Sequence, residues 1–309
     1  MRESGDMNIG VIGLGSMGYG IASSLLRAGH RVYGADINAS AVERLRAEGG
    51  AAGDLIAATH ELNAVVVVVL NAAQAEAVLF GEGGVVARLA PRALVMLCVT
   101  VAPDFARRAA ARCAETGVLF LDAPISGGSV KAANGKLSVM ASGSADSFAA
   151  ARPALDAMAE TVFELGFEAG AGSAMKAVNQ LLAGVHIATM AEAITFALSQ
   201  GIEPATFMKV IPACAGTSWM LENRGPHIVA GDYAPYSAVD IWPKDLGIVL
   251  DVARAAKFAA PITAAALQQF VCASGMGYGH EDDAAVAKVY ARNAGLRLPG
   301  DDDAHPRAG

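Results

Sequence analysis

The chain has few charged residues and no concentration of positive ones. Of its 309 residues only 17% are charged, and the 23 lysines and arginines are outnumbered by 30 aspartates and glutamates. The formal net charge of −7 comes without any lysine- or arginine-rich run that could neutralise a series of phosphates. We therefore expect no nucleic-acid partner. A small anionic substrate stays possible, because a pocket needs only one or two local cations.

Cysteine is also scarce, with four residues in the whole chain. They show neither a Cys-x-x-Cys spacing nor a neighbouring histidine cluster, which argues against disulfides and against a metal site. We interpret them as reduced core residues of a cytoplasmic protein and predict no bound metal. The four are Cys98, Cys113, Cys214 and Cys272.

Long hydrophobic runs and internal repeats are missing as well. The valine-rich run 64–70 is far too short to cross a bilayer, so we expect no membrane association. Residues 1–6 are polar and charged, which does not predict a signal peptide. The acidic tail 300–309 is expected to be disordered.

Apolar residues, in contrast, are abundant at 54%, and the length suffices for two domains with cores. The first part of the chain alternates predicted strands and helices, whereas the second part reads as helices only. We therefore predict an α/β fold in which an N-terminal Rossmann dinucleotide-binding domain (1–168) precedes an all-helical substrate and dimerisation domain (169–299). A long interdomain helix at 170–201 joins them.

A glycine-rich turn lies between the first predicted strand and helix. The strand Asn8–Ile12 is followed by Gly13-Leu14-Gly15-Ser16-Met17-Gly18, then by a helix at 19–28 and a second strand, Arg31–Ala35, that ends at Asp36. The glycines permit a tight turn and let a pyrophosphate approach the helix N-terminus. Asp36 is placed to bind ribose hydroxyls and to repel a 2′-phosphate, and no arginine follows it directly. The pattern predicts NAD as the cofactor.

Further parallel strands are predicted at 64–70, 94–99 and 118–121, with later ones at 137–141 and 161–165. Ligands of open α/β sheets lie outside the carboxyl ends of the strands. The loops at Asn71, Thr100 and Ser126 are therefore expected to face one crevice. Ser126, Gly127 and Gly128 offer a hydroxyl and open backbone N–H groups for a carboxylate, although a plain turn is an equal alternative.

Near the start of the long helix, Lys176 and Asn179 are three residues apart and share one face. Ser173 is the expected N-cap, which puts Lys176 in the first turn. The helix dipole and partial burial are then expected to lower the pKa of Lys176, as a proton-transferring amine requires. A surface lysine beside an asparagine is the alternative interpretation.

In the second half, Pro204 and Pro261 suit the first positions of helices. Trp219 and Trp242 are predicted to be packing residues, with pocket lining as the alternative. Lys244 is expected just before a helix, where it could reach the nicotinamide end of a cofactor or be solvated.

Four segments, in their order along the chain, together resemble the β-hydroxyacid dehydrogenases, the family related to 3-hydroxyisobutyrate dehydrogenase. The resemblance extends over residues 8–299. The segments are the cofactor turn 13–18, the substrate-binding segment 122–128, the catalytic segment 172–179 and Lys244-Asp245-Leu246.

The resemblance implies roles for individual residues. Lys176 would be the catalytic acid/base, and Asn179 would orient the substrate. Thr100 and Lys244 would contact the dinucleotide. The carboxylate of a small anionic hydroxy acid would be held by Ser126, Gly127 and Gly128. Homodimers or homotetramers are implied as well.

A narrower likeness covers the segments 171–186, 215–224 and 237–246. They resemble a branch that oxidises the four-carbon sugar acid L-threonate at C2 to 2-oxo-tetronate with NAD. Asn71 and Gln180 depart from the usual family pattern, which argues against the family's usual substrates, 3-hydroxyisobutyrate and tartronate semialdehyde. A sister enzyme that acts on one of these two compounds is the alternative within the family. A non-catalytic NAD-binding protein is the alternative from a different class.

Overall fold

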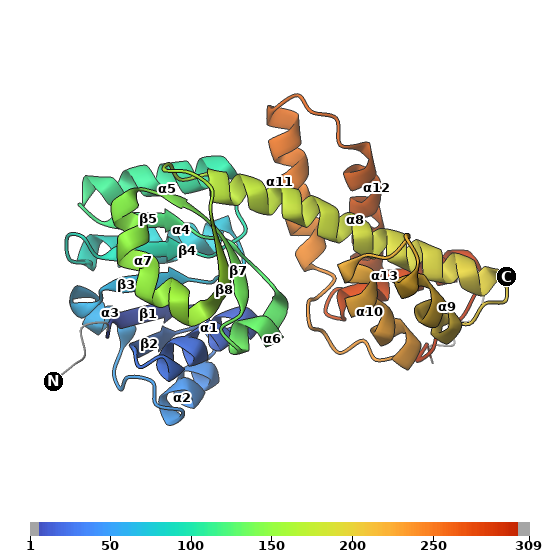
Figure 1. The fold of residues 1–309 in the computed structure, drawn as a ribbon, viewed down its shortest axis with the longest axis horizontal. Helices are drawn as coiled ribbons and strands as arrows, with labels where there is room; N and C mark the ends of the chain where they lie inside the picture. The colour runs from blue at the N-terminus through green and yellow to red at the C-terminus, as the bar shows by residue number, and fades with distance from the viewer. Residues whose placement is uncertain (1–5, 302–309) are drawn as a thin grey trace. The chain divides into compact units, whose positions relative to one another are not determined.

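The computed structural model describes residues 6–301, which form two compact units, one up to Ala177 and one from Val178. The first unit is α/β and the second is helical, as Figure 1 shows, so the predicted fold class is confirmed. The boundary between the units falls inside one continuous helix. We keep 1–168 and 169–299 as the proposed domains, and the predicted disordered tail falls mainly outside the described residues.

The first unit is built on an eight-stranded sheet with the order β2-β1-β3-β4-β5-β7-β6, in which β8 pairs with β7. Strands β1 to β5 are parallel, β7 is antiparallel to β5 and β8 is parallel to β7. All the predicted strands are present, but β3 and β4 end earlier than predicted because the chain leaves the sheet to form loops. The bounds are β1 Asn8–Ile12, β2 Arg31–Ala35, β3 Ala64–Val67, β4 Leu94–Leu97, β5 Leu119–Asp122, β6 Ile125–Ser126, β7 Leu137–Gly143 and β8 Ala159–Glu164.

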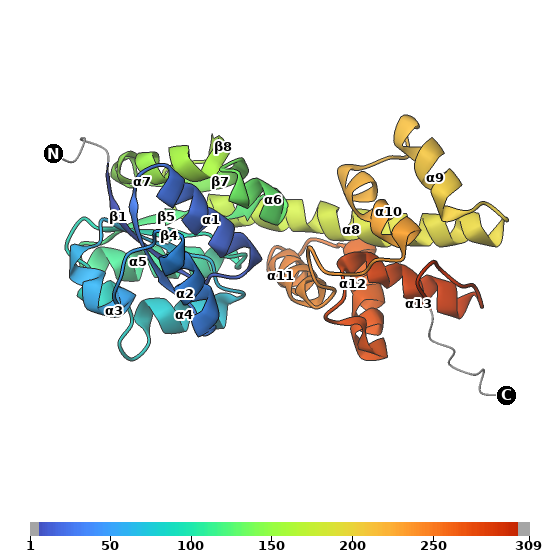
Figure 2. The same ribbon diagram turned by 90° about the horizontal axis from the view of Figure 1, so that it is seen from below.

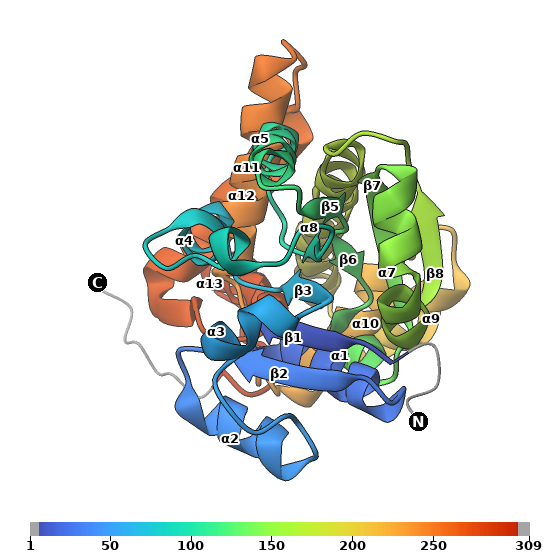
Figure 3. The same ribbon diagram turned by 90° about the vertical axis from the view of Figure 1, so that its left-hand side faces the viewer.

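Helices cover both faces of this sheet (Figure 3). Val66 of β3 belongs to a buried cluster that includes residues of α1 and α7, whereas its neighbours Val65 and Val67 belong to a second cluster with residues of α4 and α5. Burial on both faces explains the near-continuous valine run. The helices are α1 Ser16–Arg27, α2 Ala39–Ala47, α3 Leu55–Ala58, α4 Ala72–Phe80, α5 Pro103–Glu115, α6 Gly128–Ala133 and α7 Ala145–Met158.

In the second unit, helices pack around the long helix α8. Helices α9 and α10 lie on one side of α8 and α11 and α12 on the other (Figure 2). A Cβ at Gly184 of α8 would lie 2.8 Å from atoms of both Trp242 and Leu246 in α11, so glycine permits this close approach. The bounds are α8 Ala171–Ser199, α9 Pro204–Val210, α10 Trp219–Ala230, α11 Ile241–Ala255, α12 Pro261–Ala273 and α13 Val286–Asn293. Shorter turns lie at Thr59–Glu61, Val86–Arg88, Ile211–Ala213, Ser274–Tyr278 and Asp283–Ala285.

Among the described residues, α8 is long and apolar enough to cross a membrane by length and composition. However, its residues Ile187, Met190 and Ile194 are at most 2% exposed and belong to the core of the second unit. Burial in a protein core therefore accounts for the apolar residues in this part of α8.

The two tryptophans behave differently. Trp242 is buried, stacks on Phe270 with ring centroids 5.5 Å apart and donates its indole N–H to Asp283 at 2.9 Å. Trp219 is 58% exposed, so the prediction that it is a packing residue is wrong. It is the first residue of α10, directly after the capping Ser218, where the helix start faces solvent.

Trp242 contacts a buried ionic cluster of four residues. The Nε of Arg224 donates to the Oδ1 of Asp283 at 2.5 Å and lies 3.9 Å from the Oδ1 of Asp282. The Nδ1 of His227 lies 3.7 Å from the same atom of Asp282. Burial raises the pKa of Asp283, and the guanidinium of Arg224 counteracts that shift. Arg224 is thus an ion-pairing residue of the second unit's core.

Candidate functional site

The predicted site residues of the first unit that follow strands lie at one edge of the sheet. Because β1 to β5 are parallel, their carboxyl ends share this edge. The glycine turn follows β1, Asp36 follows β2 and Thr100 comes after β4, while Ser126 ends β6. In the sheet, β2 lies on one side of β1 and β3 on the other, so the order in which successive strands are added changes direction at β1. Open α/β sheets bind ligands at such a point.

The glycines of the turn serve different purposes. Gly13 has a φ of 92°, and a Cβ there would lie 2.5 Å from the backbone oxygen of Val68. A Cβ at Gly18 would lie 1.8 Å from the backbone oxygen of Gly13, so packing requires both glycines. No atom lies within 4 Å of a Cβ built on Gly15, and no side chain caps α1. The first N–H groups of α1, from Ser16 on, therefore lie beside open space that an anion can enter.

Asp36 holds this turn in place. Its Oδ2 accepts a hydrogen bond from the N–H of Leu14 at 2.5 Å, and its Oδ1 accepts one from Asn38 at 2.7 Å. Each carboxylate oxygen can accept a second hydrogen bond, so the group can still bind a pair of hydroxyls. Its negative charge disfavours an additional phosphate at the same place.

The segment Ser126–Gly128 has a backbone conformation that depends on its two glycines. Ser126 is half-buried and pairs with Ser138 of β7. Gly127 and Gly128 have φ values of 132° and 77°, which side-chain-bearing residues rarely adopt. A Cβ on Gly128 would meet no atom within 4 Å, so its backbone is accessible. The nearby Lys131 lies 3.8 Å from Glu160.

The start of α8 is capped from a distant strand, not by Ser173. The Oδ2 of Asp122, at the end of β5, accepts hydrogen bonds from the N–H groups of Gly170 and Ser173, both at 2.9 Å. Its Oδ1 accepts one from the Ser173 hydroxyl at 2.7 Å. Ser142 of β7 donates to Asp122 at 3.3 Å and accepts from the N–H of Gly172 at 3.0 Å. The prediction of a local N-cap is therefore wrong.

Lys176 is the sixth residue of α8 and so lies in the second turn, not in the first. It is only 8% exposed. Because charged groups are rarely buried without a structural or chemical reason, the interpretation as a surface lysine does not hold.

In the second unit, Asn179 and Lys244 lie at the two ends of one chain of contacts. The Nδ2 of Asn179 donates to Gln180 at 2.9 Å, and the Nε2 of Gln180 donates to Asp245 at 2.5 Å. The Nζ of Lys244 lies 2.7 Å from the other carboxylate oxygen of Asp245. Gln180 and Asp245 are both buried. Lys244 lies inside the first turn of α11 and not before the helix, as had been predicted.

Four residues of these networks were not predicted from the sequence as site components. Gln180 was visible only as a departure from the family pattern, and Asp122 only as part of a quoted segment. Asp245 was likewise only part of the quoted segment Lys244-Asp245-Leu246, and nothing in the sequence pointed to Ser142. The other departure, Asn71, caps α4 by accepting a hydrogen bond from Gln74 at 2.9 Å.

Two known families match consecutive parts of the chain. Residues 8–166 match the family described as the NAD binding domain of 6-phosphogluconate dehydrogenase. Residues 170–290 match the one described as NAD-binding of NADP-dependent 3-hydroxyisobutyrate dehydrogenase.

Individual relatives match over nearly their full lengths. The L-threonate dehydrogenase of Cupriavidus necator is 50% identical, with 95% of this chain and 98% of the relative covered. The L-threonate dehydrogenase of Escherichia coli K12 is 47% identical, with 97% and 99% covered. The crystal structure of a 3-hydroxyisobutyrate dehydrogenase from Salmonella typhimurium has a TM-score of 0.87 at 46% identity, covering 92% of this chain and 100% of that one.

Proposed function

The chain belongs to the β-hydroxyacid dehydrogenase family related to 3-hydroxyisobutyrate dehydrogenase, and we propose that within it this enzyme oxidises L-threonate at C2 to 2-oxo-tetronate. It is an NAD-dependent oxidoreductase acting on a hydroxy acid. The two relatives named L-threonate dehydrogenase support the substrate, being 50% and 47% identical over nearly the whole chain.

The residues of the first unit fit a dinucleotide. The open space beside Gly15, the uncapped start of α1 and the carboxylate of Asp36 supply room, N–H donors and hydroxyl acceptors. We assign the pyrophosphate to the turn 13–18, where Ser16 and Met17 contribute backbone N–H groups while the N–H of Leu14 is bonded to Asp36. We assign further contacts to Thr100 and Lys244. When bound, NAD supplies a nicotinamide that accepts a hydride.

In the reaction we propose, the chain's own residues position the acid and move one proton. The hydroxyl and the open N–H groups of Ser126, Gly127 and Gly128 hold the carboxylate. Asn179 orients the C2 hydroxyl, and the neutral amine of Lys176 takes its proton as the hydride leaves C2. A fixed carboxylate and a fixed hydroxyl reduce the entropy lost on reaching the transition state. The single observation that carries this proposal is the buried lysine, 8% exposed, on the helix that also bears Asn179.

A panel of hydroxy acids tests the substrate. Initial rates of NADH formation are measured with L-threonate, D-threonate, 3-hydroxyisobutyrate and L-serine, and with tartronate semialdehyde in the reductive direction. We expect L-threonate to give the highest kcat/KM. A higher value for 3-hydroxyisobutyrate or tartronate semialdehyde would assign a sister activity, and no NADH signal with any acid would favour a non-catalytic NAD-binding protein.

Asp36→Ala is expected to weaken the use of NAD more than that of NADP. The variant loses a charged acceptor of ribose hydroxyls, and hydrogen bonds to charged groups are worth about 1.5–3 kcal/mol, or about 10–100-fold in kcat/KM. The ratio of kcat/KM for NAD to that for NADP is measured for both proteins. A ratio equal to that of the wild type would contradict the role of Asp36.

We also propose that the enzyme is a cytoplasmic homodimer or homotetramer. Met175, Val178 and Leu182 follow one another along one side of α8, and each is between 45% and 54% exposed. Such an apolar stripe is typical of subunit contacts. Light scattering on wild type and Val178→Asp tests this, and a monomeric wild type would contradict it.

A further inference from the structure

One carboxylate connects the substrate-holding segment to the helix that carries the proposed base. Asp122 ends β5, four residues before Ser126, and is 0% exposed. Its two oxygens accept three hydrogen bonds from Gly170 and Ser173 at the start of α8. Lys176 follows Ser173 by three residues, about one helical turn further along.

We propose that Asp122 is a positioning residue of the reaction, which fixes Lys176 relative to the segment Ser126–Gly128 and favours the protonated amine through its charge. This inference rests on the proposed role of Lys176 as the base. It concerns residues of the first unit only.

The packing around Asp122 leaves little freedom at this junction. A Cβ on Gly172 would lie 2.4 Å from the backbone oxygen of Met140 and 2.9 Å from that of Asp122. The first turn of α8 therefore sits directly on β5 and β7. The hydroxyl of Ser142 adds two hydrogen bonds, since it donates to Asp122 and accepts from the N–H of Gly172. Any shift of α8 along its axis would break these bonds together.

The carboxylate of Asp122 affects α8 through its charge as well as through its hydrogen bonds. The first turn of α8 contains no acidic residue, so Asp122 supplies the negative charge that a helix N-terminus favours. Burial raises the pKa of Asp122, while the hydrogen bonds from Ser173, Gly170 and Ser142 lower it. Asp122 thus places a negative charge at the positive end of the helix dipole, the end from which the dipole was expected to act on Lys176.

Two other ionisable groups lie close to this junction. Cys98, just after β4, faces Asp122, and burial raises the pKa of its thiol to about 12, so it is neutral in the working pH range. Arg107 of α5 approaches Gly170, where a Cβ would lie 2.7 Å from its Nη1, and it pairs with Asp104.

Asp122→Asn separates charge from geometry. The amide oxygen can accept the two backbone N–H groups, and the amide nitrogen can donate to the Ser173 hydroxyl, which is able to reverse its role. Without the charge, the acid limb of the kcat–pH profile with L-threonate and NAD is expected to move to lower pH by about half a unit or more. The dissociation constant of NADH, measured by fluorescence, is expected to stay within about twofold of the wild-type value, because the cofactor turn is untouched.

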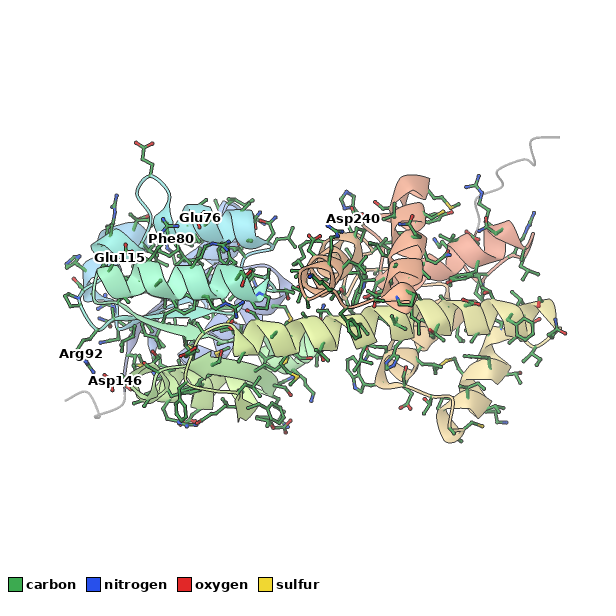
Figure 4. All side chains as sticks on the ribbon, turned by 90° about the horizontal axis from the view of Figure 1, so that it is seen from above. Glu76, Phe80, Arg92, Glu115, Asp146 and Asp240 are labelled. Carbon is green, nitrogen blue, oxygen red and sulfur yellow. The ribbon has the colours of Figure 1, made fainter. Side chains whose placement is uncertain are left out.

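The matched control is Asp146→Asn, which removes the same charge from the first turn of another helix of the first unit. Asp146 lies at the surface beside Arg92 (Figure 4), with 3.1 Å between its Oδ2 and the Nη2 of Arg92. Its pH profile is expected to coincide with that of the wild type. Should Asp122→Asn not fold, Ser173→Ala tests the positioning, since it loses one hydrogen bond to Asp122 but keeps the charge. Its kcat is expected to fall by about threefold or more.

Two results would overturn the inference. The first is an active wild type together with an Asp122→Asn variant whose kcat–pH profile has its acid limb at the wild-type pH. The second applies if Asp122→Asn does not fold, and it is a kcat of Ser173→Ala equal to that of the wild type. A wild type that oxidises no acid of the panel would instead contradict the proposed function, and with it this inference.

Discussion

Lys176→Ala is expected to lower kcat by about 10²–10⁴-fold, because general acid–base catalysis by one positioned side chain typically contributes that much. Without the amine, no described side chain is assigned to take the proton of the C2 hydroxyl. The turn 13–18 and Asp36 are unchanged, so NADH should bind with wild-type affinity. Stopped-flow or steady-state rates with L-threonate, together with fluorescence titration of NADH, measure both quantities.

Two companion variants make this test specific. Lys176→Arg keeps a positive charge but cannot release a proton near neutral pH, so it should be as inactive as the alanine variant. The exposed Lys136 belongs to the same unit, and Lys136→Ala should stay within about twofold of wild type. If Lys176→Ala retains more than about a tenth of the wild-type kcat, Lys176 is not the base.

Arg224→Met is expected to lower the free energy of unfolding of the second unit by about 3–5 kcal/mol, since it leaves buried carboxylates without their counter-ion. Asp282 and Asp283 are both 0% exposed, and Asp283 receives a hydrogen bond from Arg224 at 2.5 Å. Both tryptophans of the chain belong to this unit, and Trp242 contacts Asp283 directly. Tryptophan emission during urea denaturation therefore reports on this unit.

The loss of unfolding free energy in Arg224→Met should depend on pH in a defined direction. Burial raises the pKa of Asp283 above its value in the unfolded chain, so the native state binds the extra proton and its stability falls as pH rises through that interval. Removing Arg224 extends this fall to higher pH, and the destabilisation should be smaller at pH 5 than at pH 8. Arg254→Met is the control, because Arg254 is 79% exposed and forms a surface ion pair with Asp251 of its own helix. An equal effect of the two substitutions would contradict the structural role of Arg224.

Features that depend on neighbours in sequence were predictable. Strand β2 runs over Arg31–Ala35 as expected, and α9 and α12 begin at Pro204 and Pro261. The glycine turn was predicted for the same reason, since the strand, the turn and the helix start follow one another directly. The sequence also indicated Lys176 and Asn179, which are separated by less than one helical turn.

Features that depend on contacts across the fold were not predictable. The bond from Ser173 to Asp122 joins residues 51 positions apart, and that from Gln180 to Asp245 joins residues 65 apart. A serine at a helix start is an ordinary local cap, and only the position of β5 shows that another residue takes this role. The exposure of Trp219 likewise depends on where α10 begins on its unit's surface.

Position-specific isotope transfer tests the central claim most directly. The protein is incubated with NAD and with L-threonate that carries deuterium at C2, and the reduced cofactor is analysed by mass spectrometry. The account predicts NADH with one deuterium and an acid that has lost it, because the hydride leaves C2. Unlabelled NADH, or no reduction while deuterium is retained at C2, would contradict it.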